Sequence, residues 1–147
     1  MQLNRQTDYA LRALLFLAMQ EKLSTIDDIA KKFFIAREHL TKIISRLAKL
    51  NYVIAIRGKG GGLKINPSAL TASLAEIIKH FEPTLKPIDC ENLACPLSGI
   101  CRLNLVLDEA SHSFIATLEK YTLNDILPKK AHERTAVFKK LNILTRK

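Results

Sequence analysis

Two short helical segments separated by a tight break constrain the fold of this chain more than any other feature. Thr25 and Asp28 form a capping-box pattern that predicts the start of a helix running to about residue 33. After a break at 34–35, residues 36–51 place aliphatic side chains on one face and polar, mostly basic ones on the opposite face. Two helices joined by a tight turn, the second with a basic polar face, predict a helix-turn-helix.

The hydrophobic period changes directly after this second helix. Residues 52–56 are β-prone, residues 57–62 read RGKGGG, and residues 63–65 alternate again, which predicts a β-hairpin with a glycine-rich tip. The tip lacks the following Ser/Thr and the spacing of a phosphate-binding P-loop. We therefore interpret the hairpin as a wing whose backbone can approach DNA, and not as a nucleotide site.

The flanking segments supply further helices. Apolar residues cover most sides of 7–20, so we expect a helix buried from more than one direction. Thr7 is its expected N-cap, and Asp8 lies in the first turn, where a carboxylate suits the helix dipole. Ser73, with Glu76 three residues later, predicts another capping box and a further helix.

A long helix is predicted from Leu103, where apolar residues recur at helical spacing. Its apolar surplus lies beyond an already complete domain, which favours a dimerisation element over a helix that folds back on its own domain. The expected fold class is mainly α with a small β-hairpin wing: a winged helix-turn-helix plus a long C-terminal dimerisation helix. The expected parts are a DNA-binding domain (1–81), a cysteine cluster-binding loop (82–102), a dimerisation helix with a short end helix (103–128) and a basic tail (129–147).

The charge of the chain is distributed unevenly along its length. The net charge is +9, with twelve basic against five acidic residues in 1–66, four against eight in 67–128, and seven against one in 129–147. A basic N-terminal half and tail favour nucleic acid as a partner, although charge for general solubility is the alternative. No run of apolar residues is long enough to span a membrane, and the N-terminus does not resemble a signal peptide. We therefore expect a cytoplasmic protein.

All three cysteines of the chain lie in one short stretch. Cys90, Cys95 and Cys101 follow the spacing C-x4-C-x5-C. In a reducing cytoplasm an odd, clustered set favours metal or redox chemistry over structural disulfides. Zinc sites usually pair their cysteines as C-x2-C, which is absent here. The residues alone leave open an iron–sulfur centre, zinc or unligated thiols, and three thiolates would leave one coordination position to another ligand.

Taken in order, TDYALRAL, RGKGGGL, CxxxxCPLxxxCRL and YTLNDIL resemble the NsrR/IscR family of winged-helix iron–sulfur transcription regulators over about residues 1–128. The similarity is greatest to its nitric-oxide-sensing repressors. It implies a homodimer that binds a palindromic double-stranded DNA operator and an iron–sulfur cluster held by Cys90, Cys95 and Cys101, with [4Fe-4S] favoured and [2Fe-2S] possible. The position of a histidine ligand in IscR-type members is Asn104 here. The resemblance offers Asp8 from the partner subunit as the completing ligand instead.

The predicted function is that of a repressor that releases its operator, controlling nitric-oxide detoxification genes, when nitric oxide reacts with its cluster. A regulator responding to cluster supply or redox state, with the same fold, is the nearest alternative. A small thiol redox or metal enzyme is disfavoured, because the chain lacks C-x-x-C, a glycine motif for a cofactor and convergent acid and base residues. The candidate DNA contacts, which could instead form a solvated surface, are Arg37, Glu38, His39, Thr41, Lys42 and Arg46 on the recognition helix and Arg57, Lys59 and Gly60 on the wing.

Overall fold

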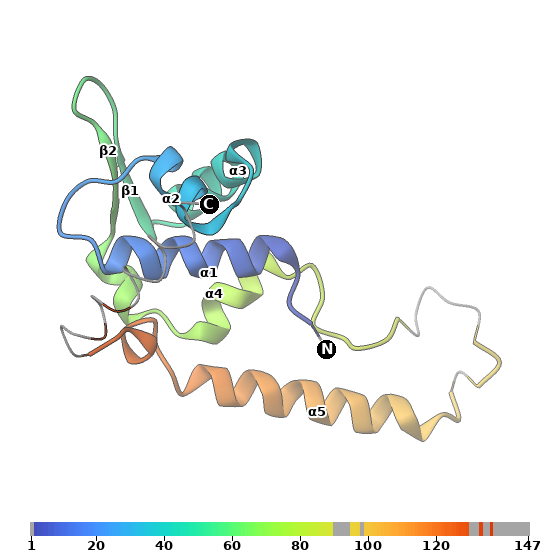
Figure 1. Cartoon of the computed structure of the whole chain (residues 1–147). Helices are drawn as coiled ribbons and strands as arrows, with labels where there is room; N and C mark the ends of the chain where they lie inside the picture. Colours follow the sequence, from blue (N-terminus) through green and yellow to red (C-terminus); the bar gives the residue numbers. More distant parts are fainter. Residues whose placement is uncertain (1, 90–94, 98, 130–132, 134–135, 137–147) are drawn as a thin grey trace.

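A computed structural model of the chain describes residues 2–89, 95–97, 99–129, 133 and 136 (Figure 1). In chain order its elements are α1 (Arg5–Ala18), α2 (Ile26–Phe33), α3 (Arg37–Lys49), β1 (Val53–Ile56), β2 (Gly62–Ile65), the 3-10 turn η1 (Pro67–Thr71), α4 (Leu74–Phe81), α5 (Arg102–Glu119) and the 3-10 turn η2 (Asn124–Ile126). The predicted fold class, mainly helical with a two-stranded wing and a long C-terminal helix, is confirmed. The expectation for the basic tail falls largely outside the described residues.

Helix α1 is the centre of the N-terminal region. It packs against α2, α3, α4 and β2 (Figure 1). Its residues Ala10, Ala13, Leu14 and Leu17 are buried, because its apolar side chains point in several directions and find a neighbour in each. The prediction of a helix covered from more than one side is therefore confirmed.

The predicted N-cap of α1 was wrong. Asn4 caps the helix, and its Oδ1 accepts a hydrogen bond from the Thr7 backbone at 2.9 Å. Thr7 lies inside the first turn, fully buried, and its hydroxyl donates to Glu82 Oε1 at 2.6 Å. Asn is as good an N-cap as Thr, and the acceptor that satisfies Thr7 lies 75 residues away in the sequence. Local pattern alone could not reveal that partner.

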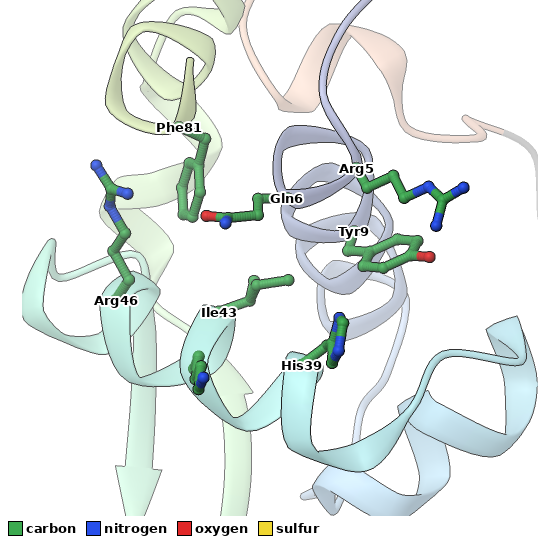
Figure 2. A pocket seen from close by; sticks show the side chains of 8 residues that line it. Arg5, Gln6, Tyr9, His39, Ile43, Arg46 and Phe81 are labelled. Carbon is green, nitrogen blue, oxygen red and sulfur yellow. The ribbon is translucent and has the colours of Figure 1, made fainter. Parts of the chain in front are cut away.

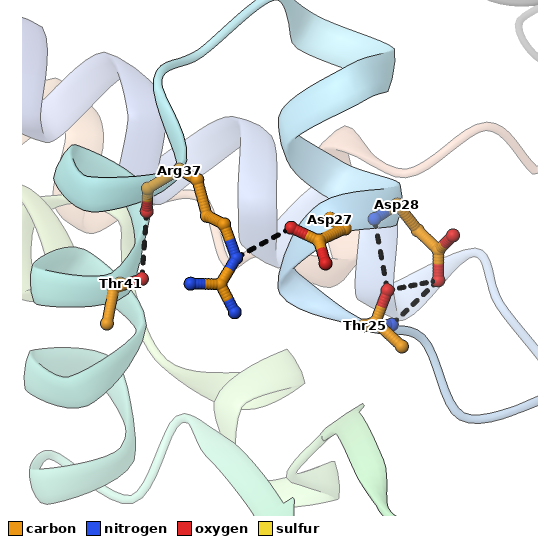
Figure 3. Close-up of polar contacts among 5 residues, drawn as sticks. All are labelled: Thr25, Asp27, Asp28, Arg37 and Thr41. Atoms are coloured by element: carbon orange, nitrogen blue, oxygen red, sulfur yellow. Dashed lines mark hydrogen bonds and ion pairs between the residues drawn. The ribbon is translucent and has the colours of Figure 1, made fainter.

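Helices α2 and α3 form the predicted helix-turn-helix. The Thr25–Asp28 capping box is present, with both reciprocal bonds formed (Figure 3). Phe34 ends α2 in the left-handed conformation at φ 54°, which turns the chain toward α3. Ala36 precedes α3 without a side-chain cap. An ion pair between Arg37 Nε and Asp27 Oδ1, at 2.7 Å, joins the start of α3 to α2.

The wing is an antiparallel pair, β1 and β2, whose register runs from Val53 opposite Ile65 to Ile56 opposite Gly62. Its tip needs glycine at a defined place: a Cβ on Gly61 would lie 2.2 Å from the backbone oxygen of Ile56. Because that contact is with backbone, a side chain at this position would force the turn to open.

Helix α4 begins at a Ser73 cap, whose hydroxyl accepts from the Glu76 backbone at 3.1 Å. The expected capping box is half formed, because the Glu76 carboxylate accepts a 2.5 Å bond from the Tyr52 hydroxyl. Burial raises the pKa of Tyr52, and the Glu76 carboxylate raises it further. The phenol therefore stays neutral and joins the start of the wing to α4.

Helix α5 differs from all of these elements, since none of its residues is buried in a single chain. It contacts α4, where Lys79 Nζ pairs with Glu119 Oε1 at 2.9 Å. Its other end extends away from the body of the molecule (Figure 1). Exposed apolar residues gather near that end: Leu103, Leu105 and Val106. Among the described residues no helix is both long and apolar enough to cross a membrane.

Candidate nucleic-acid interface and metal centre

Helix α3 separates its core side chains from its polar ones. Its apolar residues Leu40, Ile43, Ile44 and Leu47 are buried. Most of the predicted DNA contacts on α3 are exposed: Arg37, Glu38, His39, Lys42 and Arg46. Thr41 is half-buried. The helix is thus anchored on one face and offers the other to a partner.

At the start of α3, the structure holds Arg37 and Thr41 in defined positions. The Arg37 guanidinium pairs with Asp27, and the Thr41 hydroxyl donates to the Arg37 backbone oxygen at 2.8 Å (Figure 3). The Arg37 side chain is 65% exposed and that of Asp27 is 54% exposed. Such a pair contributes little to stability, so its main consequence is to restrict where the Arg37 side chain can point.

The predicted wing contacts lie at the exposed tip of the hairpin. Arg57, Lys59 and Gly60 are all exposed. Gly58 and Gly60 have φ of 98° and 82°, a conformation that glycine adopts without strain. The tip therefore presents two cations on a narrow turn, the form that suits contact with phosphates or a DNA groove.

Three of the predicted contacts face α1 instead of α2. His39, Lys42 and Arg46 line a cavity of about 350 Å³ between α3, the first turns of α1 and the end of α4 (Figure 2). The residues that sequence reasoning missed here are Arg5, Gln6, Tyr9 and Phe81. The charge of Arg5 could be read from the sequence, but no periodicity indicates which helix it faces.

The cysteine loop is described in part. Cys95 and Cys101 are free thiols, each half-buried, and Cys90 lies outside the described residues. Cys101 is the N-cap residue of α5, and its backbone N–H donates to the Leu97 oxygen at 3.0 Å. Cys101 thus lies where the turn from residue 97 leads into α5.

Asp8 lies on α1 with a local partner of its own. Its Oδ1 accepts a bond from Arg12 Nε at 2.8 Å, and both side chains are exposed by more than two fifths. In the described part of one chain, no three His, Cys, Asp or Glu residues come together at metal-binding distance. The prediction that Asp8 completes a site in the partner subunit stays a prediction.

A polar cluster joins α1 to the start of the cysteine loop. Glu82, the residue after α4, accepts bonds from Asn4 and from Thr7 at 2.6 to 3.0 Å. Asn4 also donates to the Phe81 backbone oxygen at 2.9 Å. Glu82 is followed directly by Pro83, so a shift of the loop would act on the first turn of α1.

Comparison with known proteins places these features in context. Residues 3–129 match the Rrf2 family, described as iron-dependent transcriptional regulators. The HTH-type transcriptional regulator NsrR of Bacillus licheniformis is 39% identical over 139 residues, which covers 91% of this chain and 97% of the relative. NsrR of Bacillus subtilis is 39% identical over 136 residues, covering 88% and 92%.

Solved structures show the same fold at lower identity. The global cysteine regulator CymR of B. subtilis has a TM-score of 0.68 and 20% identity, covering 86% of this chain and 95% of that one. IscR of T. potens has a TM-score of 0.67 and 22% identity, covering 86% and 85%.

Proposed function

This chain belongs to the Rrf2 family of transcriptional regulators, and we propose that it is a homodimeric repressor that senses nitric oxide through an iron–sulfur cluster. The observation that carries the proposal is the 39% identity to regulators named NsrR over almost the whole chain. The family is one of transcription regulators, in accord with the expectation that the chain is not an enzyme.

The available donor set fits an iron–sulfur cluster. Cys95 and Cys101 are free, half-buried thiols in one turn-rich loop, and thiolates are the usual ligands of such clusters. We propose Cys90 as the third ligand and Asp8 of the partner subunit as the fourth. When bound, the cluster would supply iron that reacts with nitric oxide.

We propose a separate role for each segment along the chain. Residues 1–81 would bind DNA, 82–102 would hold the cluster, 103–128 would dimerise and 129–147 would form a basic arm. Exposed Leu103, Leu105 and Val106 on α5 support the dimer, since large apolar side chains gathered on one exposed helix end are typical of an interface. To read two half-sites one helical turn of DNA apart, the dimer would have to hold its two α3 helices about 34 Å apart.

The contacts of Glu82 support a structural coupling between the cysteine loop and the DNA-binding region. Its bonds to Asn4 and Thr7 hold the first turn of α1, and α1 packs directly on α3. Asp8 lies in that same turn of α1. Loss of the cluster would release both the cysteine loop and the partner's Asp8 carboxylate. The change would therefore reach α1, the helix that packs against α3 and the wing, and the operator affinity would fall.

The proposal is tested with anaerobically purified protein. We expect absorption from thiolate-to-iron bonds that nitric oxide removes, together with loss of operator binding. Cys95→Ala should abolish both the absorption and the response. A Cys95→Ala protein that keeps the spectrum and the response would overturn the ligand assignment.

Asp8 allows a matched comparison with Arg12. Asp8→Ala and Arg12→Ala both remove the ion pair seen at 2.8 Å, but only Asp8→Ala removes the carboxylate. We expect an altered cluster spectrum or faster loss to nitric oxide in Asp8→Ala alone. Equal behaviour of the two variants would show that Asp8 has only its local role.

A further inference from the structure

A groove runs beside the recognition helix, between α1 and α3. The cavity of about 350 Å³ described above adjoins a second one of about 530 Å³, which shares Arg5, Gln6, Arg46 and Phe81 with it. The two cavities therefore form one groove, which we call the α1–α3 groove. It runs from the middle of α3, past the first turn of α1, to Glu82 at the start of the cysteine loop.

The charge around the first cavity is one-sided. Arg5, Lys42 and Arg46 line it together with His39, and no carboxylate does. In the part of the chain that the structure describes, none of these four makes an ion pair, whereas Arg12, Arg37 and Lys79 each pair with a carboxylate. Three unbalanced cations around one hollow create a potential that attracts an anion.

The position of Arg5 has no evident structural purpose. It is the first residue of α1, where the helix dipole disfavours a cation. Its side chain extends at the rim of the groove beside Tyr9 (Figure 2). Arg5 and Glu82 both line the second cavity, but among the described residues Arg5 makes no ion pair. A cation placed against the local field without an ion-pair partner indicates an external anionic partner.

The Arg46 side chain is restricted by a contact with Phe81 and can bind such a partner. Its guanidinium carbon lies over the Phe81 ring, 4.9 Å from the centroid, a cation–π contact that restricts the side chain. A guanidinium fixed in this way can offer its fork of donors to phosphate oxygens.

The form of the groove favours an extended anion over a small enclosed one. The side chains that would meet the anion are exposed: Arg5, His39, Lys42 and Arg46. Three of these four belong to α3 and are themselves among the predicted DNA contacts. When a recognition helix lies in the major groove, the phosphate backbones run along its flanks. The α1–α3 groove lies along one flank of α3.

We propose that the α1–α3 groove binds backbone phosphates of the operator, and that Arg5 is a DNA contact outside the helix-turn-helix and the wing. The inference rests on the proposed function, because that function places α3 on DNA. It adds α1 to the DNA-binding surface at the same turn that Glu82 holds.

The test compares Arg5→Gln with Lys120→Gln. Both remove one exposed cation, and Lys120 follows α5 and does not line the groove. Operator recovered from a randomised duplex pool, and an unrelated duplex, are titrated by fluorescence anisotropy at several salt concentrations. Arg5→Gln should weaken binding to both duplexes by a similar factor and reduce the slope of log K against log salt by about 0.9. Lys120→Gln should leave the slope unchanged.

Phosphate ethylation interference identifies the contact directly. Ethylation of certain operator phosphates should block binding of the wild-type protein. For at least one of these phosphates, ethylation should no longer affect binding of Arg5→Gln. Lys42→Gln, a second exposed variant in the groove, should reduce the salt slope as well, and circular dichroism confirms that both variants are folded. Identical titrations and interference patterns for Arg5→Gln and Lys120→Gln would overturn the proposal.

Two other results are distinguishable. If the wild-type protein binds no duplex, the proposed function itself fails. If Arg57→Gln weakens binding but Arg5→Gln does not, only the groove assignment fails. Inorganic phosphate that shifts groove resonances in wild-type protein but not in Arg5→Gln, with DNA binding unchanged, would identify a small-anion site and overturn the DNA proposal.

Discussion

The N-terminal region and helix α5 contain similar apolar residues but bury them differently. One continuous core gathers around α1 in residues 2–81, with Leu14, Leu40 and Leu47 fully buried, and it also takes in Leu123 from the segment after α5. In α5, Leu105 is 67% exposed and no residue is buried. The N-terminal region is complete in one chain, whereas α5 lacks a covering surface. The difference supports the proposed dimer, in which a second copy would cover α5.

The largest expected effect is on the stability of the N-terminal core. Leu14→Ala should lower the free energy of unfolding by about 3–5 kcal/mol, because a fully buried leucine is replaced by a cavity. Urea denaturation measures the loss. Leu105→Ala, the same substitution on α5, is the matched control and should cost much less in a monomeric sample. Equal losses would contradict the contrast between the two regions.

The next effect concerns association. Val106→Asp places a charge among the exposed apolar residues of α5. We expect the dissociation constant of the proposed dimer to rise about tenfold or more, because burying an unpaired charge is costly. Analytical ultracentrifugation measures the change. Glu109→Asp, a conservative change on an exposed residue of the same helix, should leave it unaltered. An unchanged dimer in Val106→Asp would place the interface elsewhere.

A smaller effect is expected at the junction between the two regions. Glu82→Ala should lower the free energy of unfolding by about 1–3 kcal/mol, because it leaves the buried Thr7 hydroxyl without its acceptor. In Thr7→Val the same acceptor loses its donor. The double variant should cost less than the sum of the single variants, since both remove one shared bond. Strict additivity of the unfolding free energies would show that the Thr7–Glu82 bond contributes nothing.

The smallest effect is a pH dependence. Backbone and hydroxyl donors of Thr25 lower the pKa of Asp28 below its usual range. The charged carboxylate therefore stabilises the fold above its ordinary pKa, and this contribution is lost as pH falls through the lowered value. Asp28→Asn should lower the free energy of unfolding by less than about 1 kcal/mol near neutral pH. It should also reduce the loss of stability between neutral and acid pH. Urea unfolding midpoints at pH 7 and pH 3 measure this change. If the midpoints of the wild type and of Asp28→Asn fall equally between the two pH values, Asp28 does not contribute to the pH dependence.

The parts that the sequence predicted well depend on near neighbours. The Thr25–Asp28 box and the hairpin both follow from residues within a few positions of each other. Helical and strand periodicities, together with glycines at fixed offsets, carry this information.

The parts that the sequence could not supply depend on distant residues. Thr7 bonds Glu82, and Glu76 bonds Tyr52 instead of completing its own box. Arg5 lines one cavity with Lys42 and Arg46 only because α1 packs against α3. The predicted ligand set involves Cys90, outside the described residues, and an Asp8 from another chain, so it remains a prediction.

The most direct test follows cluster and DNA in one anaerobic sample. Nitric oxide is titrated into the protein bound to fluorescent operator, while the thiolate-to-iron absorption and the anisotropy are recorded together. The account predicts that both signals fall in parallel and that the DNA is released when the absorption is gone. Full loss of the absorption with the operator still bound at unchanged affinity would contradict the claim that the cysteine loop controls DNA binding.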